Sequence, residues 1–396
     1  MFFVALKMLT GDRAKFFGII FGITFASMLI TQQASIFVGI MTRTFGFLTD
    51  TNQPDLWVMD PKVQFVDDIK PMQDTMLLRV RGVEGVRWAM PLYKGLIQAR
   101  MENGTFQTCN VVGLDDATLI GGPGEMIEGS LEDLRLADSV IVDQVGAATR
   151  LAKPAPGAPR DAEGNIPKDW PREPLTVGDT LELNDRRAVV VGICKVSRTF
   201  QSQPVVYTTY SRATLYAPQQ RKLLSFILVK AEDGVDPGIL SERITHQTGL
   251  AAYLTKDFIV KTYMYFIKYT GIPINFGISV MLGFLVGTAI AGQTFYNFTL
   301  DNLKQFGALK AMGAGNGKLL LMILLQALIV GLLGYGIGVG VGSSFAILSK
   351  NSELAFMLVW QTLVVTGVAV TVICILASLL SIQKVIRLEP AIVFKG

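Results

Sequence analysis

Residues 299–319 read TLDNLKQFGALKAMGAGNGKL, a short basic segment between two long apolar runs. Its larger apolar residues recur at a spacing of three, which predicts that they share one helix face: Leu300, Leu303, Phe306 and Leu309. Polar side chains take the more exposed positions: Asp301, Lys304, Gln305 and Lys310. The glycines at 313, 315 and 317 predict the end of this helix. On periodicity alone, the segment either turns the chain around at a membrane surface or docks a partner.

The chain has 396 residues, half of them hydrophobic, and its apolar residues gather in four long blocks. About 20 helical residues cross the core of a bilayer, and each block reaches that length. We therefore predict an α-helical membrane protein with transmembrane helices at residues 16–42, 269–298, 319–349 and 354–382. A cleaved signal peptide is the alternative for the first block. That block is longer than the apolar core of a signal peptide, and no small-residue cleavage site closes it.

The distribution of charge predicts the orientation of these helices. Three short flanks carry nine basic residues against three acidic ones: Lys7, Arg13, Lys15, Lys304, Lys310, Lys318, Lys384, Arg387 and Lys395, against Asp12, Asp301 and Glu389. By the positive-inside rule these flanks, and so both termini, are cytoplasmic. They form an amphipathic N-terminal helix at residues 1–15, a helix and loop at 299–318, and a tail at 383–396. The net charge of +4 therefore reports topology and gives no reason to expect a nucleic-acid partner.

Residues 43–268 then form an extracytoplasmic domain, which holds 28 of the 32 acidic residues. Its β-rich runs and intervening helical patterns predict an α+β fold inserted between the first and second transmembrane helices. The expected strands are residues 55–59, 86–98, 106–114 after a turn at 103–104, 139–142, 180–196, 205–208 and 225–229. The expected helices are residues 71–80, 143–151, 211–216, 237–248 and 256 onward. Residues 152–174 contain six prolines and predict a surface insertion.

Catalytic and metal-binding patterns are mostly missing from the sequence. His246 is the only histidine, and it lies in a polar helical stretch that favours a surface position. Cys109 and Cys194 are expected in strands as small apolar residues, with a disulfide between them as the less favoured alternative, and Cys374 lies in the last span. Adjacent carboxylates, as at residues 67–68, fit solvated turns, because neighbouring strand residues point to opposite faces. We therefore expect no catalytic residues, no metal site and no cofactor in this chain.

The glycines of residues 313–318, GAGNGK, resemble a phosphate-binding loop only superficially. Such a loop needs a glycine where Met312 stands and a serine or threonine where Leu319 stands. A second set of glycines forms a stripe along the third span and predicts close helix packing, within this chain or with a second copy: Gly331, Gly334, Gly338 and Gly342. Polar residues such as Asn297 and Gln326 are rare in the spans, which argues against conduction of a hydrophilic solute.

Residues 305–342, QFGALKAMGAGNGKLLLMILLQALIVGLLGYGIGVGVG, resemble the signature of the FtsX/MacB-type ABC transporter permeases. In that family, an E-[FI]-G-x-[LM]-[KR]-A-[LM]-G-A-like segment precedes a glycine-rich span. The leader LKMLTGDRAKFFGIIFGITFA and the tail LEPAIVFKG are similar to the family's ends, and GVEGVRWAMPLY, SVIVDQVGAATRL and VGDTLELNDRRAVVVGI are similar to its periplasmic core. The motif FGALKAMGA most resembles that of the DevC-like permeases, which lack a fused ATPase.

The resemblance implies a non-catalytic subunit of the bacterial inner membrane, with its large domain in the periplasm. It implies a separate ABC ATPase that binds ATP and Mg2+, a second permease copy, and an export function in which ATPase motion reaches the periplasmic domain, called mechanotransmission. A periplasmic adaptor (membrane fusion protein) and a TolC-like outer-membrane duct accompany related systems. The resemblance also implies membrane lipid as a partner, which contacts the transmembrane helices. The residues expected to contact the ATPase are Leu303, Lys304, Phe306, Gly307, Leu309, Lys310 and Met312.

Departures from the family pattern and rival functions stay open at this point. Gln305 and Gln326 stand where acidic residues are common in the family, which leaves the charge pairs with the ATPase undefined. One alternative is a permease that extracts lipoproteins, and another is an FtsX-like regulator that activates a cell-wall hydrolase. A third is a membrane-anchored sensor or scaffold without an ATPase. The sequence does not name the cargo among lipids, glycolipids, peptides and drugs, nor distinguish a homodimer from a heterodimer.

Overall fold

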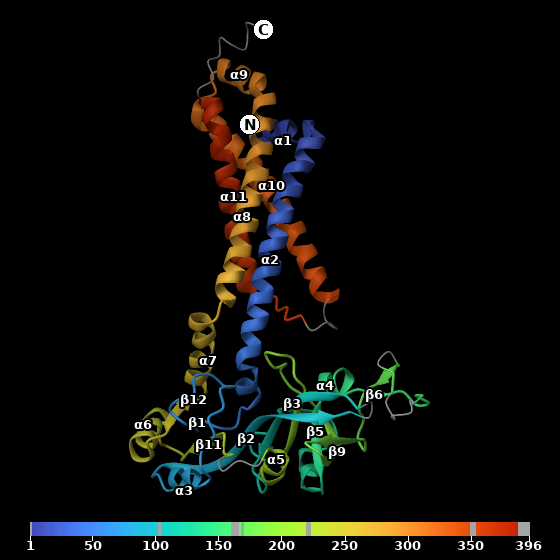
Figure 1. The fold of residues 1–396 in the computed structure, drawn as a ribbon. Helices are drawn as coiled ribbons and strands as arrows, with labels where there is room; N and C mark the ends of the chain where they lie inside the picture. The colour runs from blue at the N-terminus through green and yellow to red at the C-terminus, as the bar shows by residue number, and fades with distance from the viewer. Residues whose placement is uncertain are drawn as a thin grey trace. The chain divides into compact units, whose positions relative to one another are not determined.

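The computed structural model describes residues 2–101, 104–159, 166–167, 170–218, 223–348 and 354–386. The chain forms two compact units (Figure 1). The first unit combines Met1–Ile40 with Thr270–Gly396, and the second unit is Met41–Tyr269. Both boundaries lie close to the expected ends of the extracytoplasmic domain at residues 43 and 268.

The first unit is helical throughout its regular structure. Its helices are α1 Phe2–Gly11, α2 Arg13–Asp50, α8 Ile272–Asp301, α9 Leu303–Ala311, α10 Asn316–Leu348 and α11 Trp360–Ile386, and α2 continues into the second unit. Within the described part of the chain, four helices are long and apolar enough to cross a membrane: Arg13–Asp50, Ile272–Asp301, Asn316–Leu348 and Trp360–Leu379. The prediction of four membrane helices with a folded domain between the first and the second is therefore confirmed.

The glycine stripe of α10 packs against helices of the same chain. A Cβ atom at Gly334 would lie 2.7 Å from Cγ2 of Ile23, and one at Gly338 would lie 2.6 Å from Cβ of Ser27, both on α2. Gly342 faces Thr31 on α2, and Gly331 faces α11. Small residues let the helix backbones approach closely, so the stripe joins α10 to two neighbouring spans.

The fourth membrane helix begins later than the apolar block that predicts it. Residues 354–359 are not helical, and α11 begins at Trp360. In this segment the N–H of Met357 donates a hydrogen bond of 3.0 Å to the carbonyl of Ser35 on α2. A Cβ at Gly39 would lie 2.4 Å from the carbonyl oxygen of Ala355. The backbone of the segment thus lies directly on α2, which an apolar count alone does not reveal.

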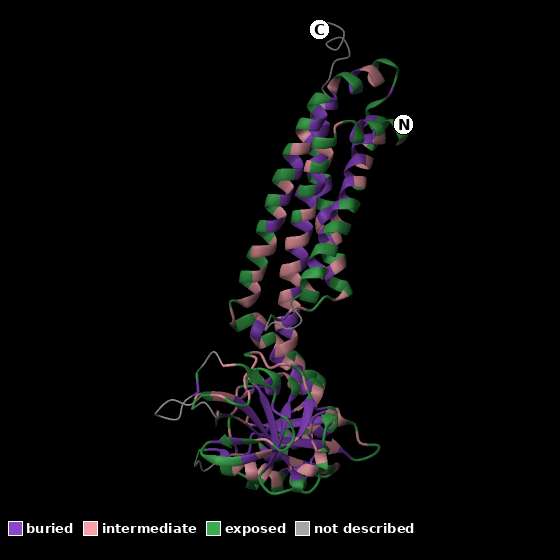
Figure 2. Ribbon diagram, turned by 90° about the vertical axis from the view of Figure 1, so that its right-hand side faces the viewer, coloured by how far each residue is buried: buried purple, intermediate pink, exposed green. Residues whose placement is uncertain are grey.

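The second unit is built on a ten-stranded mixed sheet in the order β12-β1-β11-β2-β3-β10-β5-β9-β4, with β8 paired to both β2 and β9. The bounds are β1 Leu56–Met59, β2 Val86–Arg100, β3 Phe106–Leu114, β4 Glu125–Glu128, β5 Ser139–Asp143, β8 Thr180–Leu183, β9 Arg186–Lys195, β10 Val205–Thr209, β11 Phe226–Ala231 and β12 Ala251–Leu254. The pairings join β2, β3, β10, β5, β9 and β8 in a closed cycle, in which β3 with β10 and β5 with β9 are parallel. Figure 2 shows buried residues concentrated on these strands.

Short helices complete the second unit and confirm its mixed helix and strand class. They are α3 Thr75–Arg81, the 3-10 helix η1 Leu131–Arg135, α4 Gln144–Ala148, α5 Tyr210–Tyr216, α6 Pro237–Thr248 and α7 Thr255–Tyr269. Leu240 and Ile244 of α6 share one core with strands β1 and β11. A second core surrounds Trp57, whose ring meets Phe226 edge-on at 5.6 Å. Apolar burial on both sides of β1 and β11 holds this part of the sheet in place.

One expectation for the second unit needs correction, and one is confirmed. The run 180–196 is not one strand, because Asn184 and Asp185 adopt positive φ angles of 49° and 60° and turn the chain between β8 and β9. Cys109 and Cys194 are both buried free thiols, and they lie in different cores. They are thus the small apolar strand residues that the sequence favours, and the less favoured disulfide does not form.

The insertion at residues 152–174 is partly structured. It contains a two-stranded pair, β6 Lys153–Pro154 and β7 Arg172–Glu173, and the indole N–H of Trp170 donates to the carbonyl of Ala155 at 3.0 Å. Residues 160–165 and 168–169 of the insertion, Asn103 of the expected turn, and residues 387–396 of the expected tail lie outside the described residues.

Candidate functional site

Helix α9 follows α8 through a sharp corner at Asn302. The side-chain amide of Asn302 donates to the carbonyl of Phe298 at 2.8 Å and so binds the last turn of α8. The backbone carbonyl of Asn302 accepts the N–H groups of Gln305 and Phe306, each at 3.0 Å, at the start of α9. One buried residue therefore satisfies backbone groups on both helices, and the direction of α9 relative to α8 is fixed.

The apolar face of α9 points into the protein. Phe306 is fully buried, Gly307 is buried, and Leu303 and Leu309 are half-buried against the core of the first unit. Phe306 and Gly307, which the sequence expects at the contact with an ATPase, are thus buried within the chain and hold α9 on the spans.

The outward surface of α9 is mostly polar. Lys304 and Gln305 are exposed, and Met312 directly after the helix is 76% exposed. An exposed methionine beside polar side chains is a typical adaptable contact for a protein partner. Of the residues expected to contact an ATPase, Lys304 and Met312 are thus the ones presented to the surroundings.

The C-terminal end of α9 is fixed by two specific contacts. Gly313 has a φ angle of 90°, and the N–H of Ala314 donates to the carbonyl of Leu309 at 3.0 Å, which is the pattern of a glycine helix stop. The ammonium of Lys310 donates to the carbonyl of Ile386 at 3.0 Å. This carbonyl belongs to the last turn of α11, where backbone acceptors lack helix partners and favour a cation. Lys310 thus ties α9 to the end of the fourth span.

Helix α1 is attached to the third span by apolar packing and by a buried amide. Ala5, Met8 and Leu9 are buried in the core of the first unit. The side-chain N–H of Gln326 on α10 donates to the carbonyl of Ala5 at 2.8 Å, and both residues are buried. A lone amide in an apolar span was visible in the sequence, but its partner 321 residues away was not.

Lys15 links the start of α2 to the end of α8. Its ammonium forms an ion pair with Asp12 at 3.1 Å and a second ion pair with Asp301. The side-chain hydrogen bond from Lys15 holds the pKa of the exposed Asp12 carboxyl below its ordinary value. These three charges appeared in the sequence only as topology signals, and the fold brings them together.

Helices α1 and α9 lie at the same end of the first unit (Figure 1) and border a cleft of about 680 Å3. The residues that line this cleft come from α1, the α1–α2 connection, and the α8–α9 corner: Phe3, Val4, Lys7, Met8, Gly11, Asp12, Asp301, Asn302 and Gln305. One wall is therefore partly apolar, and the other is acidic and amide-rich.

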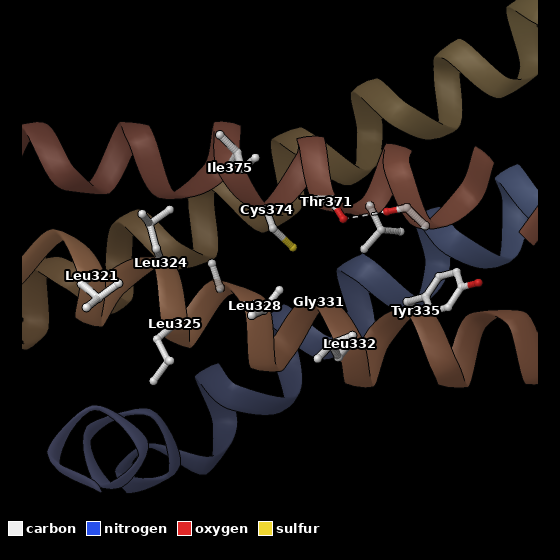
Figure 3. A pocket seen from close by; sticks show the side chains of 13 residues that line it. Leu321, Leu324, Leu325, Leu328, Gly331, Leu332, Tyr335, Thr371, Cys374 and Ile375 are labelled. Atoms are coloured by element: carbon white, nitrogen blue, oxygen red, sulfur yellow. Dashed lines mark hydrogen bonds between the residues drawn. The ribbon is translucent and has the colours of Figure 1, made fainter. Parts of the chain in front are cut away.

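A second cavity, of about 470 Å3, lies between α10 and α11 and is lined almost entirely by apolar side chains (Figure 3). Its hydroxyl groups already donate within the protein: Thr371 to the carbonyl of Gly367 at 2.8 Å, and Tyr335 to that of Leu363 at 3.1 Å. Cys374 points from α11 toward Gly331 of α10. The cavity offers no charged group to a hydrophilic solute.

Acidic residues of the second unit perform structural tasks. Asp115 accepts the N–H of Thr118 at 2.9 Å, Asp133 accepts the N–H of Ser130 at 2.8 Å, and Asp67 pairs with Lys94. His246 is exposed on α6. No cluster of three or more His, Cys, Asp or Glu side chains suited to a metal ion occurs among the described residues.

Family models cover most of the chain. The model described as "MacB-like periplasmic core domain" matches residues 16–247, and the model described as "FtsX-like permease C-terminal" matches residues 277–390. An uncharacterized ABC transporter permease of Mycobacterium tuberculosis (strain ATCC 25618 / H37Rv) is 25% identical over 335 residues, 82% of this chain and 80% of the relative. One from Mycobacterium bovis (strain ATCC BAA-935 / AF2122/97) is 25% identical over 247 residues, 61% of this chain and 66% of the relative.

Two solved structures are also similar in part. The periplasmic region of MacB from Actinobacillus actinomycetemcomitans is 15% identical and covers 56% of this chain and 96% of that chain, with a TM-score of 0.36. The extracellular domain of the ABC-type transporter YknZ from Gram-positive bacteria is 12% identical and covers 51% of this chain and 98% of that chain, with a TM-score of 0.31.

Proposed function

The chain belongs to the FtsX/MacB-type ABC transporter permeases of the inner membrane, with a periplasmic domain, and from this premise we propose that it transmits ATP-driven motion to that domain. ATP and Mg2+ bind to a separate ATPase subunit, which docks on α9. The chain itself is non-catalytic. Both termini and α9 face the cytoplasm, in keeping with the nine basic residues of the short flanks.

One observation carries this proposal: α9 is fixed to the spans on one side and open on the other. Phe306 is fully buried in the unit, while Met312, Lys304 and Gln305 are exposed. A helix that merely turned the chain around at a membrane surface would place its apolar residues toward lipid. Here they pack against the protein, and the polar face is left for a partner.

Force applied to α9 has three routes into the spans. The core around Phe306 connects α9 to the spans, Lys310 connects it to the end of α11, and Asp301 connects the α8–α9 corner to Lys15 of α2. Helix α2 continues as far as Asp50, beyond the boundary of the periplasmic unit at Met41. Motion of α9 therefore reaches that unit through the chain, without a solute crossing between the helices.

Further partners complete the proposal. A second permease copy forms a dimer, and an adaptor and an outer-membrane duct receive the exported molecule from the periplasmic domain. The cavity between α10 and α11 is mainly apolar and has no charged lining residue, so it does not suit the passage of a hydrophilic molecule. This supports export of the molecule by a route outside the helix bundle.

Purification of the tagged full-length chain from its own membranes tests this proposal. We expect an ABC ATPase to co-purify, and Met312→Asp combined with Lys304→Glu to release it while the permease remains folded. Phe17→Ala is the control, because Phe17 is exposed on α2 and is not part of α9. Absence of any ATPase from the wild-type preparation contradicts the proposal and favours a sensor or scaffold. Phe306→Asp is unsuitable, because it buries a charge and unfolds the unit.

A further inference from the structure

One face of α1 is exposed and includes large apolar side chains. Phe3 is 71% exposed, and Val4 and Lys7 on the same helix are also exposed. The opposite face of α1, with Ala5, Met8 and Leu9, is buried in the unit. The sequence predicts an amphipathic helix here, and in the structure its buried apolar face meets the protein. The exposed face of α1, which includes Phe3 and Val4, is therefore a second apolar surface that lies outside the unit's core.

This helix is held in place relative to α9. The hydrogen bond from Gln326 to the carbonyl of Ala5 fixes α1 on α10. The ion pairs of Lys15 with Asp12 and Asp301 fix the α1–α2 connection on the α8–α9 corner. The two walls of the cleft between them are therefore parts of one packed unit.

The cleft is continuous with the outward surface of α9. Gln305 is exposed on α9 and also lines the cleft, together with Phe3 and Val4 of the facing wall. A protein that covers Lys304, Gln305 and Met312 therefore reaches the mouth of the cleft. The exposed apolar side chains of α1, Phe3 and Val4, line this cleft and are therefore close to the same protein.

The charges of the cleft favour a protein over lipid. Asp12 and Asp301 share the single ammonium of Lys15, and both carboxylates are substantially exposed. They retain acceptor capacity for a basic or amide donor. Lys7 also lines the cleft, so its lining combines a cation with two carboxylates and the amides of Asn302 and Gln305. This mixture of donors and acceptors suits the surface of a protein, whereas acyl chains satisfy none of these groups.

We propose that the cleft between α1 and α9 is a second docking point for the ATPase that binds α9. It receives an element of that subunit in which an apolar side chain contacts Phe3 and Val4 and a neighbouring basic side chain faces Asp12 and Asp301. This inference rests on the proposed function and deepens it. The N-terminal helix then senses the ATPase directly, and Lys15 passes its displacement to α2.

The test compares two phenylalanines of equal exposure. Phe3 and Phe21 are each 71% exposed, but Phe3 lines the cleft and Phe21 lies on α2 outside it. We expect Phe3→Ala to weaken binding of the purified ATPase by the full-length permease by about tenfold, as for a central interface aromatic. Phe21→Ala should change it less than twofold. Equal affinity of both variants and the wild type overturns the inference but leaves docking on α9 intact.

A second measurement distinguishes the ATPase from the membrane as the occupant. The native cysteines at 109, 194 and 374 are buried, so the thiol of a Phe3→Cys variant is selectively labelled with a fluorophore. We expect addition of the ATPase to shield this probe from a water-soluble quencher, and a lipid-borne quencher in the bilayer to have little effect without ATPase. Strong quenching from the lipid that the ATPase does not change assigns the face to the membrane and refutes the proposal. Failure of the wild-type chain to bind any ATPase refutes docking on α9 as well.

Discussion

The α1–α9 end of the first unit and the sheet of the second unit use polar side chains in contrasting ways. In the second unit, Asp143 is almost fully buried, and its two carboxylate oxygens accept the N–H groups of Gly146 at 2.7 Å and Val205 at 2.6 Å. At the α1–α9 end, Asp12 and Asp301 are exposed and share Lys15. Buried and fully used acceptors favour one rigid arrangement, whereas exposed ion pairs exchange partners at little cost. This difference predicts that the sheet of the second unit is more rigid than the α1–α9 end of the first unit.

The largest expected effect is on Phe306, the fully buried aromatic residue of α9. Phe306→Ala removes a fully buried ring, and truncation of a buried phenylalanine costs about 3–5 kcal/mol. We expect the thermal midpoint of the permease in detergent to fall markedly. Phe17→Ala removes an exposed ring and should leave it nearly unchanged. If the two variants unfold alike, α9 is not anchored by Phe306.

A smaller loss is expected for the buried carboxylate of the second unit. Asp143→Asn keeps the size of the side chain but leaves one of the two backbone N–H groups facing an amide donor, at a cost of about 1–3 kcal/mol. Hydrogen exchange of the backbone at residues 143–148 should accelerate, while exchange in α6 should not. Unchanged protection at α4 means that these hydrogen bonds do not hold the strand end.

The pH responses of the two regions should run in opposite directions. Burial raises the pKa of Asp143, although backbone hydrogen bonds from Gly146 and Val205 oppose this. Its contribution to stability is therefore complete below the ordinary value of about 3.9 and is lost as pH rises through the raised pKa. The pKa of Asp12 is lowered by Lys15, so the contribution of Asp12 is present above about 3.9 and is lost as pH falls through the lowered pKa.

The measurement is the ratio of hydrogen-exchange rates between variant and wild type at each pH, in which the intrinsic pH dependence cancels. For Asp143→Asn, wild-type protection near α4 should grow relative to the variant as pH falls from 7 toward 4. For Asp12→Asn, the ratio near the α1–α2 connection should stay constant over that range. If wild-type protection near α4 instead decreases relative to the variant as the pH falls, burial does not raise the pKa of Asp143.

The smallest effect is expected where one amide secures α1. Gln326→Leu removes its hydrogen bond to Ala5, and such bonds between membrane helices contribute about 0.6 kcal/mol on average. Exchange of the α1 amides should therefore rise only about threefold, and α10 should stay protected. A global loss of stability would mean that Gln326 supports the bundle and not α1 in particular.

Features set by composition and local pattern were predictable from the sequence. The apolar blocks identify the membrane helices, and the pattern at residues 237–248 predicts α6 with its bounds. The glycines after Met312 predict the helix stop that Gly313 provides. These features depend on neighbours within a few turns of the chain.

Features set by distant packing were not predictable. Periodicity identified the apolar face of α9, but only the fold shows that Phe306 turns toward the protein. Lys15 and Asp301 are 286 residues apart, so no local pattern links them. The late start of α11 depends on contacts of residues 354–359 with α2. Each of these is a tertiary contact that overrides a local preference.

The most direct test of ATPase docking on α9 is the reactivity of a thiol at position 312. In a Met312→Cys variant, the new thiol is at a site that is 76% exposed, while the native cysteines are buried. Leu348→Cys, at the other end of α10 and 83% exposed, is the control. We predict that the co-purified ATPase slows maleimide labelling at position 312 at least tenfold, by about 1.4 kcal/mol of protection, and leaves position 348 unchanged. Equal labelling of position 312 with and without the ATPase would contradict docking on α9.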